Sequence, residues 1–277
     1  MNEKYVLIKT NDELIKKEIS IEVFSELSNA ARILEEFDYI AFLGNSYIKT
    51  KEDFFNYNFS QFNVKEIDMF SVMLNSLNSI TTNHNLWEAY LKRAYKNDSS
   101  IFFDAPSSKK EKKSIFGIKD SEYYDQNIEY VIAKALRNMV VHSKKPYSEI
   151  LYDDDFKRHF IIHTEVLLQD DNLNASGKKM VSSCGRDYFD IIDIIKRAFE
   201  ITDELNLYIF NHLLQKEWIN FYSSRITIRT HLGIEWQGAY LIQFNPKYPP
   251  DHLMHLSTIS ISKNAMNGIM SLAANSL

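Results

Sequence analysis

Residues 128–140 repeat their apolar side chains at the spacing of an α-helix, and no other stretch of the sequence constrains the fold as strongly. Side chains three or four residues apart share one face of a helix. The residues on this face are Ile128, Val131, Ile132, Ala135, Leu136, Met139 and Val140. Because Pro146 disfavours helical geometry at Lys145, the pattern predicts a helix from about Ser121 to about His142, with one face buried in a core.

Three further stretches predict helices. Residues 65–95 and residues 185–229 carry apolar side chains in helical period, and the second of these stretches has a candidate break near Asp203. Residues 11–40 begin with an Asn-Asp pair that can cap a helix. Their apolar positions are Leu14, Ile15, Ile19, Ile21, Phe24, Leu27, Ala31 and Leu34. Glycine and proline are scarce, with 7 and 5 residues, which favours helices over a turn-rich β fold.

The remaining stretches suggest a loop and a few strands. Residues 97–120 are polar and include the lysine-rich run "KKEKK", so we expect a long mobile loop there. That run is either solvated or contacts nucleic acid. We expect one strand or a small hairpin at 157–168, a turn at 169–179 and a strand at 238–245. After a turn, residues 256–262 lead into a short helix.

These patterns predict a mainly α fold, a helical bundle with a small β element in the C-terminal half. The length of 277 residues allows one large domain or two small ones. We expect residues 1–150 to form the bundle. Residues 151–277 then form a helical extension with short strands that packs on the bundle, unless the two parts are one continuous domain.

Charge and cysteine content narrow the classes of function. A net charge of −5 argues against a protein that coats nucleic acid, although it allows a local basic groove. Cys184 is the sole cysteine, which leaves no intramolecular disulfide or cysteine-based zinc site and favours a reducing, cytoplasmic location. The N-terminus has no signal-peptide core, and no apolar run approaches the ~20 residues of a membrane helix.

Arg137, Asn138 and His142 gather three functional groups where the helix predicted at 121–142 ends. Histidine titrates near neutral pH and can act as general acid or base. Arginine stays charged and binds phosphate oxygens through two donors. These groups are a minimal set for cleaving RNA, in which the ribose 2′-hydroxyl is the nucleophile and arginine stabilises charge on the phosphate. We expect no metal ion or other cofactor at this site.

The run "EYVIAKALRNMVVHSKKP" at 129–146 resembles the HEPN family. The family signature is an arginine, often followed by a polar residue, and then a histidine after a short spacer; here these are Arg137, Asn138 and His142. The preceding "SEYYDQNIEYVIAKAL" is similar to the family as well, and "LNSLNSITTNHNLWEAYL" resembles an earlier helix of its bundle. The resemblance covers residues 65–146 well and the remainder loosely.

The resemblance implies a HEPN-like bundle that pairs as a homodimer, with both motif helices facing one cleft. Many members are metal-independent endoribonucleases of toxin–antitoxin, abortive-infection or antiviral systems, so an antitoxin or defence-system partner is expected. Arg137, Asn138 and His142 would be catalytic. Tyr130 and the lysines Lys134, Lys144 and Lys145 would bind RNA. Other members are non-catalytic binding modules, and a plain interaction protein with a structural Arg–His network is a third hypothesis.

Other polar groups favour structural interpretations. His84 can pack in a helix or line the cleft. His159 and His163 share one face of a predicted strand and can pack there or bind a metal. The aspartates at 153–155 suggest a solvated turn or a helix cap, and Cys184 has no evident base beside it. Residues 174–183 lack the spacing of a phosphate-binding loop, which argues against nucleotide hydrolysis.

Overall fold

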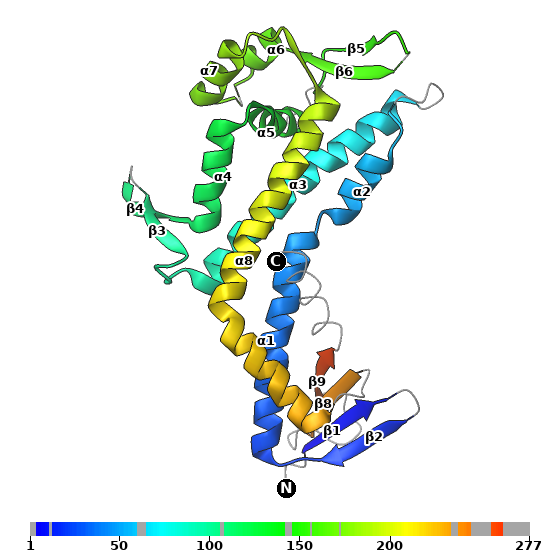
Figure 1. Ribbon diagram of the computed structural model, residues 1–277, viewed down its shortest axis with the longest axis vertical. Coiled ribbons are helices and arrows are strands. Elements are labelled where there is room, and N and C mark those ends of the chain that lie inside the picture. Colours follow the sequence, from blue (N-terminus) through cyan, green and yellow to red (C-terminus); the bar gives the residue numbers. More distant parts are fainter. Residues whose placement is uncertain are drawn as a thin grey trace. The chain divides into compact units, whose positions relative to one another are not determined.

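The computed structural model shows a mainly α-helical protein (Figure 1). It describes residues 4–10, 13–59, 65–105, 108–141, 146–155, 157–171, 173–233, 238–244 and 256–262. The chain forms two compact units, which are unit 1 (Met1–Phe42 with Phe210–Leu277) and unit 2 (Leu43–Ile209). The boundary predicted near residue 150 lies inside unit 2, so the separation into 1–150 and 151–277 stays a prediction. None of the described helices is long and apolar enough to cross a membrane.

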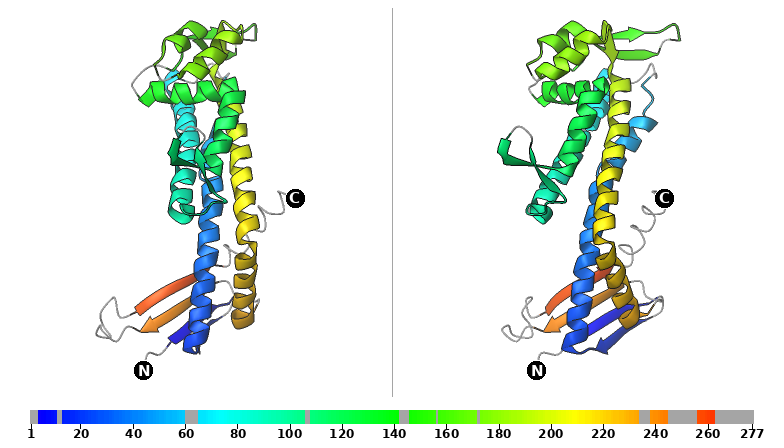
Figure 2. Two further views of the ribbon diagram at one scale, coloured as in Figure 1. Left: turned by 90° about the vertical axis from the view of Figure 1, so that its left-hand side faces the viewer. Right: turned by 60° about the vertical axis from the view of Figure 1, so that its left-hand side comes forward.

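Unit 1 combines a four-stranded antiparallel sheet with parts of two helices. The strand order is β2-β1-β8-β9, in which the strands are β1 (Lys4–Lys9), β2 (Leu14–Glu18), β8 (Gly238–Phe244) and β9 (Leu256–Ser262). The first part of α1 (Ile21–Asn45) runs beside the last part of α8 (Ile191–Leu232), as Figure 2 shows. Phe37 and Phe221 join these helices with ring centroids 4.8 Å apart. The strand predicted at 238–245 is confirmed.

The helix predicted at 11–40 begins later than expected. Leu14 and Ile15 lie in β2, where both side chains are exposed, and β2 pairs with β1 through the register Ile8↔Ile15. The helix α1 begins at Ile21, after Ser20 accepts a hydrogen bond from the Val23 amide at 3.2 Å. Pairing with β1 across a turn therefore decides the structure of residues 14–18, although their local sequence pattern favours a helix.

Unit 2 is built around α3, which matches the helix predicted at 65–95. The helices of this unit are α2 (Ile48–Asn56), α3 (Glu66–Tyr95), α4 (Ile115–Gln126), α5 (Ile128–Val141), α6 (Thr164–Gln169), α7 (Ala175–Ser183) and the first part of α8. Trp87 of α3 is fully buried, and its indole N–H donates to Asn206 of α8 at 2.7 Å. The predicted break near Asp203 is wrong, because α8 continues through it.

The helix predicted from Ser121 to His142 is two helices, α4 and α5, which meet at Asn127. Asn127 has extended backbone angles, with φ −126° and ψ 106°, and its side-chain amide donates to the Tyr123 carbonyl at 3.0 Å. Its own carbonyl accepts from the Val131 amide at 3.1 Å, which begins α5. Asparagine competes for backbone groups in this way at helix ends, so it interrupts an otherwise continuous apolar pattern.

The long loop predicted at 97–120 is wrong. The strands β3 (Phe102–Ala105) and β4 (Ser108–Ser114) pair in antiparallel fashion, and the run "KKEKK" lies in β4. Ser114 then caps α4 by accepting from the Gly117 amide at 2.9 Å. The Ser114 hydroxyl also donates to Glu88, which ties the start of α4 to α3. The polar character of this stretch therefore did not exclude strand pairing.

A small sheet and two short helices follow α5. The strands β5 (Glu149–Tyr152), β6 (Arg158–His163) and β7 (Tyr188–Asp190) form an antiparallel sheet, which confirms the strand predicted at 157–168 for its first part. The turn predicted at 169–179 is partly wrong, because α7 starts at Ala175 behind the N-cap Asn174. A Cβ on Gly177 would lie 2.9 Å from Val131, so α7 packs closely on α5.

Candidate functional site

The helix α5 buries one face and directs Arg137 and Asn138 away from it. The predicted stripe is confirmed, since Val131, Ile132, Ala135, Leu136 and Met139 are all buried. Arg137 and Asn138 are half-buried. The second face is not a solvated one, however, because Tyr130 and Ala133 are also buried there. Packing on both sides holds α5 in place and sets the positions of the two motif side chains.

Arg137 and Asn138 line a pocket of about 210 Å³ between α3 and α5. Its lining residues are Ile80, Thr81, His84, Tyr130, Lys134, Arg137 and Asn138. A neighbouring depression shares Lys134 and Asn138 with this pocket and extends past α4 to Lys113 of β4. The motif residues therefore border two hollows that share lining residues, which we call the arginine pocket and the outer depression.

The Arg137 guanidinium has unused donors. Its Nη1 donates to the Asn138 side-chain oxygen at 3.2 Å. Its Nε is buried and has no hydrogen-bond partner among the described residues. A buried donor without a partner is unfavourable, and guanidinium groups bind phosphate oxygens through paired donors. Arg137 is thus suited to accept an anionic ligand in the arginine pocket.

Asp120 of α4 binds the other two polar residues of the α5 face. The Lys134 ammonium lies 2.7 and 2.8 Å from its two carboxylate oxygens, and the Tyr130 hydroxyl donates to it at 2.6 Å. The Lys134 ammonium also lies 4.6 Å from the Tyr130 ring centroid. The sequence predicted Lys134 and Tyr130 as RNA-binding groups, yet both are engaged by this carboxylate, and Tyr130 is only 1% exposed.

Burial and neighbouring charges keep Asp120 and Tyr130 each in one protonation state. Burial alone would raise the pKa of Asp120, but the contacts with His84 and Lys134 outweigh it and hold that pKa well below its usual range. Burial and the Asp120 charge raise the pKa of Tyr130 well above its ordinary value. Asp120 is therefore a carboxylate and Tyr130 a neutral donor at any ordinary pH.

His84 joins the site from α3. Its Nδ1 is buried and lies 3.6 Å from Asp120 Oδ1, and its ring centroid is 5.0 Å from that of Phe116. The sequence contained a signal for this position, since His84 continues the buried stripe of Leu77, Ile80, Trp87 and Leu91 along α3. Asp120 had no such signal, because it lies in a polar stretch that was predicted to be a loop.

His142, Lys144 and Lys145 lie outside the described residues, as do Ser143 and the turn predicted at 246–250. The last described residue of α5 is Val141, which is 53% exposed. The structure therefore brings Arg137 and Asn138 together with Tyr130 and Lys134. The roles predicted for His142, Lys144 and Lys145 stay predictions.

His159 and His163 of β6 each meet a carboxylate. His159 Nδ1 lies 2.7 Å from Asp190 and its Nε2 lies 3.3 Å from Asp153, and the hydrogen bond with Asp190 raises the pKa of His159. His163 Nε2 lies 2.7 Å from Glu149. Within the part of the chain that the structure describes, no group of three or more His, Cys, Asp or Glu side chains could hold a metal ion. Both histidines thus contact carboxylates of the small sheet and of the turn beside it.

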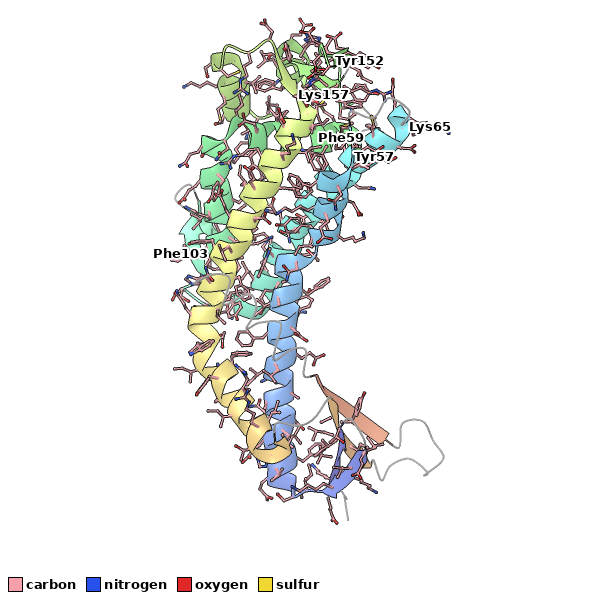
Figure 3. The ribbon with its side chains drawn as sticks, turned by 45° about the vertical axis from the view of Figure 1, so that its right-hand side comes forward. Tyr57, Phe59, Lys65, Phe103, Tyr152 and Lys157 are labelled. Atoms are coloured by element: carbon pink, nitrogen blue, oxygen red, sulfur yellow. The ribbon has the colours of Figure 1, made fainter. Side chains whose placement is uncertain are left out.

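The remaining candidates are structural. Asp153 lies in the exposed turn after β5, in the hairpin that carries Tyr152 and Lys157 (Figure 3), and accepts from the amides of Asp155 and Lys157 at 3.0 and 2.8 Å. This confirms the predicted solvated turn. Cys184 follows α7, where its thiol donates to the Val181 carbonyl at 3.0 Å.

Comparison with known proteins gives no relative for this arrangement. No protein-family model, curated protein or solved structure matches the chain.

Proposed function

We propose that this protein is a metal-independent endoribonuclease of HEPN type. RNA is the substrate, and the arginine pocket is its phosphate site. Arg137 binds the scissile phosphate, Asn138 orients the guanidinium, and His142 transfers a proton. The observation that carries the proposal is that Arg137, whose buried Nε has no hydrogen-bond partner among the described residues, lines the arginine pocket.

The chemistry uses groups that the RNA and the chain both possess. A base removes the proton of the ribose 2′-hydroxyl, and the O2′–P bond forms as the P–O5′ bond breaks. An acid then gives a proton to O5′, so the products are a 2′,3′-cyclic phosphate and a 5′-hydroxyl. Negative charge grows on the phosphate oxygens during this step, and a fixed guanidinium stabilises that charge. This route needs no metal ion to generate a nucleophile, because the 2′-hydroxyl is already part of the substrate.

The biological setting follows from the family resemblance. We propose that two copies pair through α5 and bring both Arg137–His142 sets to one cleft, and the exposed Val141 at the end of α5 offers an apolar contact for such pairing. The proposed role is that of a toxin or an antiviral, abortive-infection effector. An antitoxin or another component of the defence system would restrain it in the cytoplasm.

A non-catalytic module that binds a nucleotide, RNA or protein is the second candidate. The ion pair of Lys134 with Asp120 favours it, because this contact offsets the positive charge that Lys134 would otherwise offer to RNA. Such a module would bind RNA through Arg137 and release it uncut. Product formation separates the two candidates.

Replacing His142 with alanine is expected to lower RNA cleavage by about 10²- to 10⁴-fold, since general acid–base catalysis contributes this much. Purified full-length protein is incubated with single-stranded RNA in excess EDTA, and the product ends are identified. The dimer should persist in the variant, as measured by analytical ultracentrifugation. Cleavage at the parental rate by His142→Ala would remove His142 from the mechanism.

A further inference from the structure

His84 is the second histidine that belongs to the motif region, and it comes from a different helix. It lies on α3, and Arg137 and Asn138 lie on α5, yet all three line the arginine pocket. Its side chain is 25% exposed, so a quarter of its surface stays open while the ring packs on Phe116. A histidine in this position reaches the same ligand as Arg137.

Asp120 lies beside the imidazole of His84. Its carboxylate lies 3.6 Å from His84 Nδ1, a distance longer than a hydrogen bond but within reach of an ion pair. The same carboxylate is held by Lys134 at 2.7 Å and by the Tyr130 hydroxyl at 2.6 Å. Because two donors from α5 anchor Asp120, its carboxylate is held in a fixed position beside the imidazole ring on α3.

The two ring nitrogens of His84 are therefore different. Nδ1 is buried on the side of Asp120, which favours the tautomer that carries its proton on this nitrogen. In that tautomer Nε2 bears the lone pair. Nδ1 is shielded from solvent and has no hydrogen-bond partner among the described residues. The lone pair on Nε2 lets the imidazole act as a base.

We propose that His84 is the general base of this site, an inference that rests on the proposed ribonuclease function. His84 Nε2 takes the proton of the 2′-hydroxyl as O2′ attacks the phosphate held by Arg137. The acid of the proposed function gives O5′ its proton as the P–O5′ bond breaks. The arginine pocket then contains a proton acceptor and the phosphate-binding cation, and His84 returns its proton to solvent before the next cycle.

Several charged groups surround His84. Asp120 on α4 faces the ring as a carboxylate, Lys134 and Arg137 on α5 are cations in the same pocket, and Tyr130 is a neutral donor. Only neutral imidazole can accept a proton, so cleavage by the parent should rise with pH along an ascending limb. A variant without this base should lack that limb.

The test measures RNA cleavage by four full-length proteins in excess EDTA: the parent, His84→Ala, His84→Gln and His163→Ala. Both His84 variants should cleave at least about 10²-fold more slowly than the parent and lose the ascending limb. Added imidazole should restore activity to His84→Ala, where it can occupy the vacated space, and not to His84→Gln. His163→Ala controls for the loss of any histidine, because His163 contacts Glu149 on the small sheet, and it should match the parent.

The outcomes of this test distinguish the inference about His84 from the proposed ribonuclease function. If the parent cleaves RNA and both His84 variants cleave it at the same rate, the inference about His84 is overturned while the proposed ribonuclease function stands. An inactive parent would overturn both. If His84→Ala melts at a lower temperature than the parent, His84→Gln decides, because glutamine keeps a donor for Asp120 and a similar volume beside Phe116. A folded, fully active His84→Gln would show that the imidazole takes no part.

Discussion

Arg137→Ala cleaves RNA about 10²- to 10³-fold more slowly than the parent, if Arg137 stabilises charge on the phosphate as proposed. Removing one preorganised donor from a charge-stabilising site costs about this much. The fold should survive, because among the described residues the Arg137 side chain donates a hydrogen bond only to the neighbouring Asn138. We therefore expect the melting temperature of Arg137→Ala to stay close to that of the parent while its cleavage rate in excess EDTA falls.

Arg137→Lys is the matched variant for this prediction. Lysine keeps the positive charge but lacks the planar pair of donors that binds two phosphate oxygens at once. Its cleavage rate should fall between those of the parent and Arg137→Ala. Equal rates in all three proteins would exclude Arg137 from catalysis, and a large fall in melting temperature for Arg137→Ala would favour the structural Arg–His network instead.

Asp120→Ala should have the largest effect on stability among the residues of the site. The substitution leaves Lys134 and the Tyr130 hydroxyl without their partner, and Asp120 is 8% exposed. Breaking a buried ion pair on one side costs about 3–5 kcal/mol in the free energy of unfolding. Urea unfolding of the parent and of Asp120→Ala at neutral pH measures this difference. Asp125→Asn serves as the control, because Asp125 is exposed on the same helix and should change little.

The loss of stability in Asp120→Ala should also depend on pH, in a direction that follows from the pKa of Asp120. The pKa of Asp120 is lower in the folded protein than the ordinary value of an aspartate, because the contacts with His84 and Lys134 outweigh the effect of burial. Its contribution to stability is therefore fully present above about pH 4 and is lost as the pH falls toward the folded-state pKa. The difference between the parent and Asp120→Ala should shrink in acid. A difference that stays constant or grows there would mean that the carboxylate is not held by these cations.

The spacing of apolar residues correctly predicted the elements in which those apolar residues form the buried face. The stripe of α5 and the length of α3 follow from apolar residues at helical spacing, and β8 follows from its β-branched and aromatic residues. The hairpin of β3 and β4 and the strand β2 were missed for a physical reason. The residues of β2 and β4 are mostly polar or helix-favouring, and these segments are strands because a neighbour pairs with them rather than because of local preference.

The site was predictable only where its residues are neighbours in sequence. Arg137 and Asn138 belong to one turn of α5 and could be found together. His84 of α3 lines the arginine pocket and Asp120 of α4 lines the outer depression, 3.6 Å apart, and their approach depends on how the three helices pack. The burial of Tyr130 likewise depends on the carboxylate it meets, which no local pattern reveals.

The most direct measurement compares two oligonucleotides of identical sequence, one entirely ribonucleotide and one with a 2′-deoxy sugar at the cleaved position. Both are incubated with the parental full-length protein in excess EDTA. If the 2′-hydroxyl is the nucleophile and Arg137 holds the adjacent phosphate, the ribonucleotide strand is cut to a 2′,3′-cyclic phosphate end and the substituted strand stays intact at that position. Equal cutting of both strands, or no cutting of either, would contradict the account.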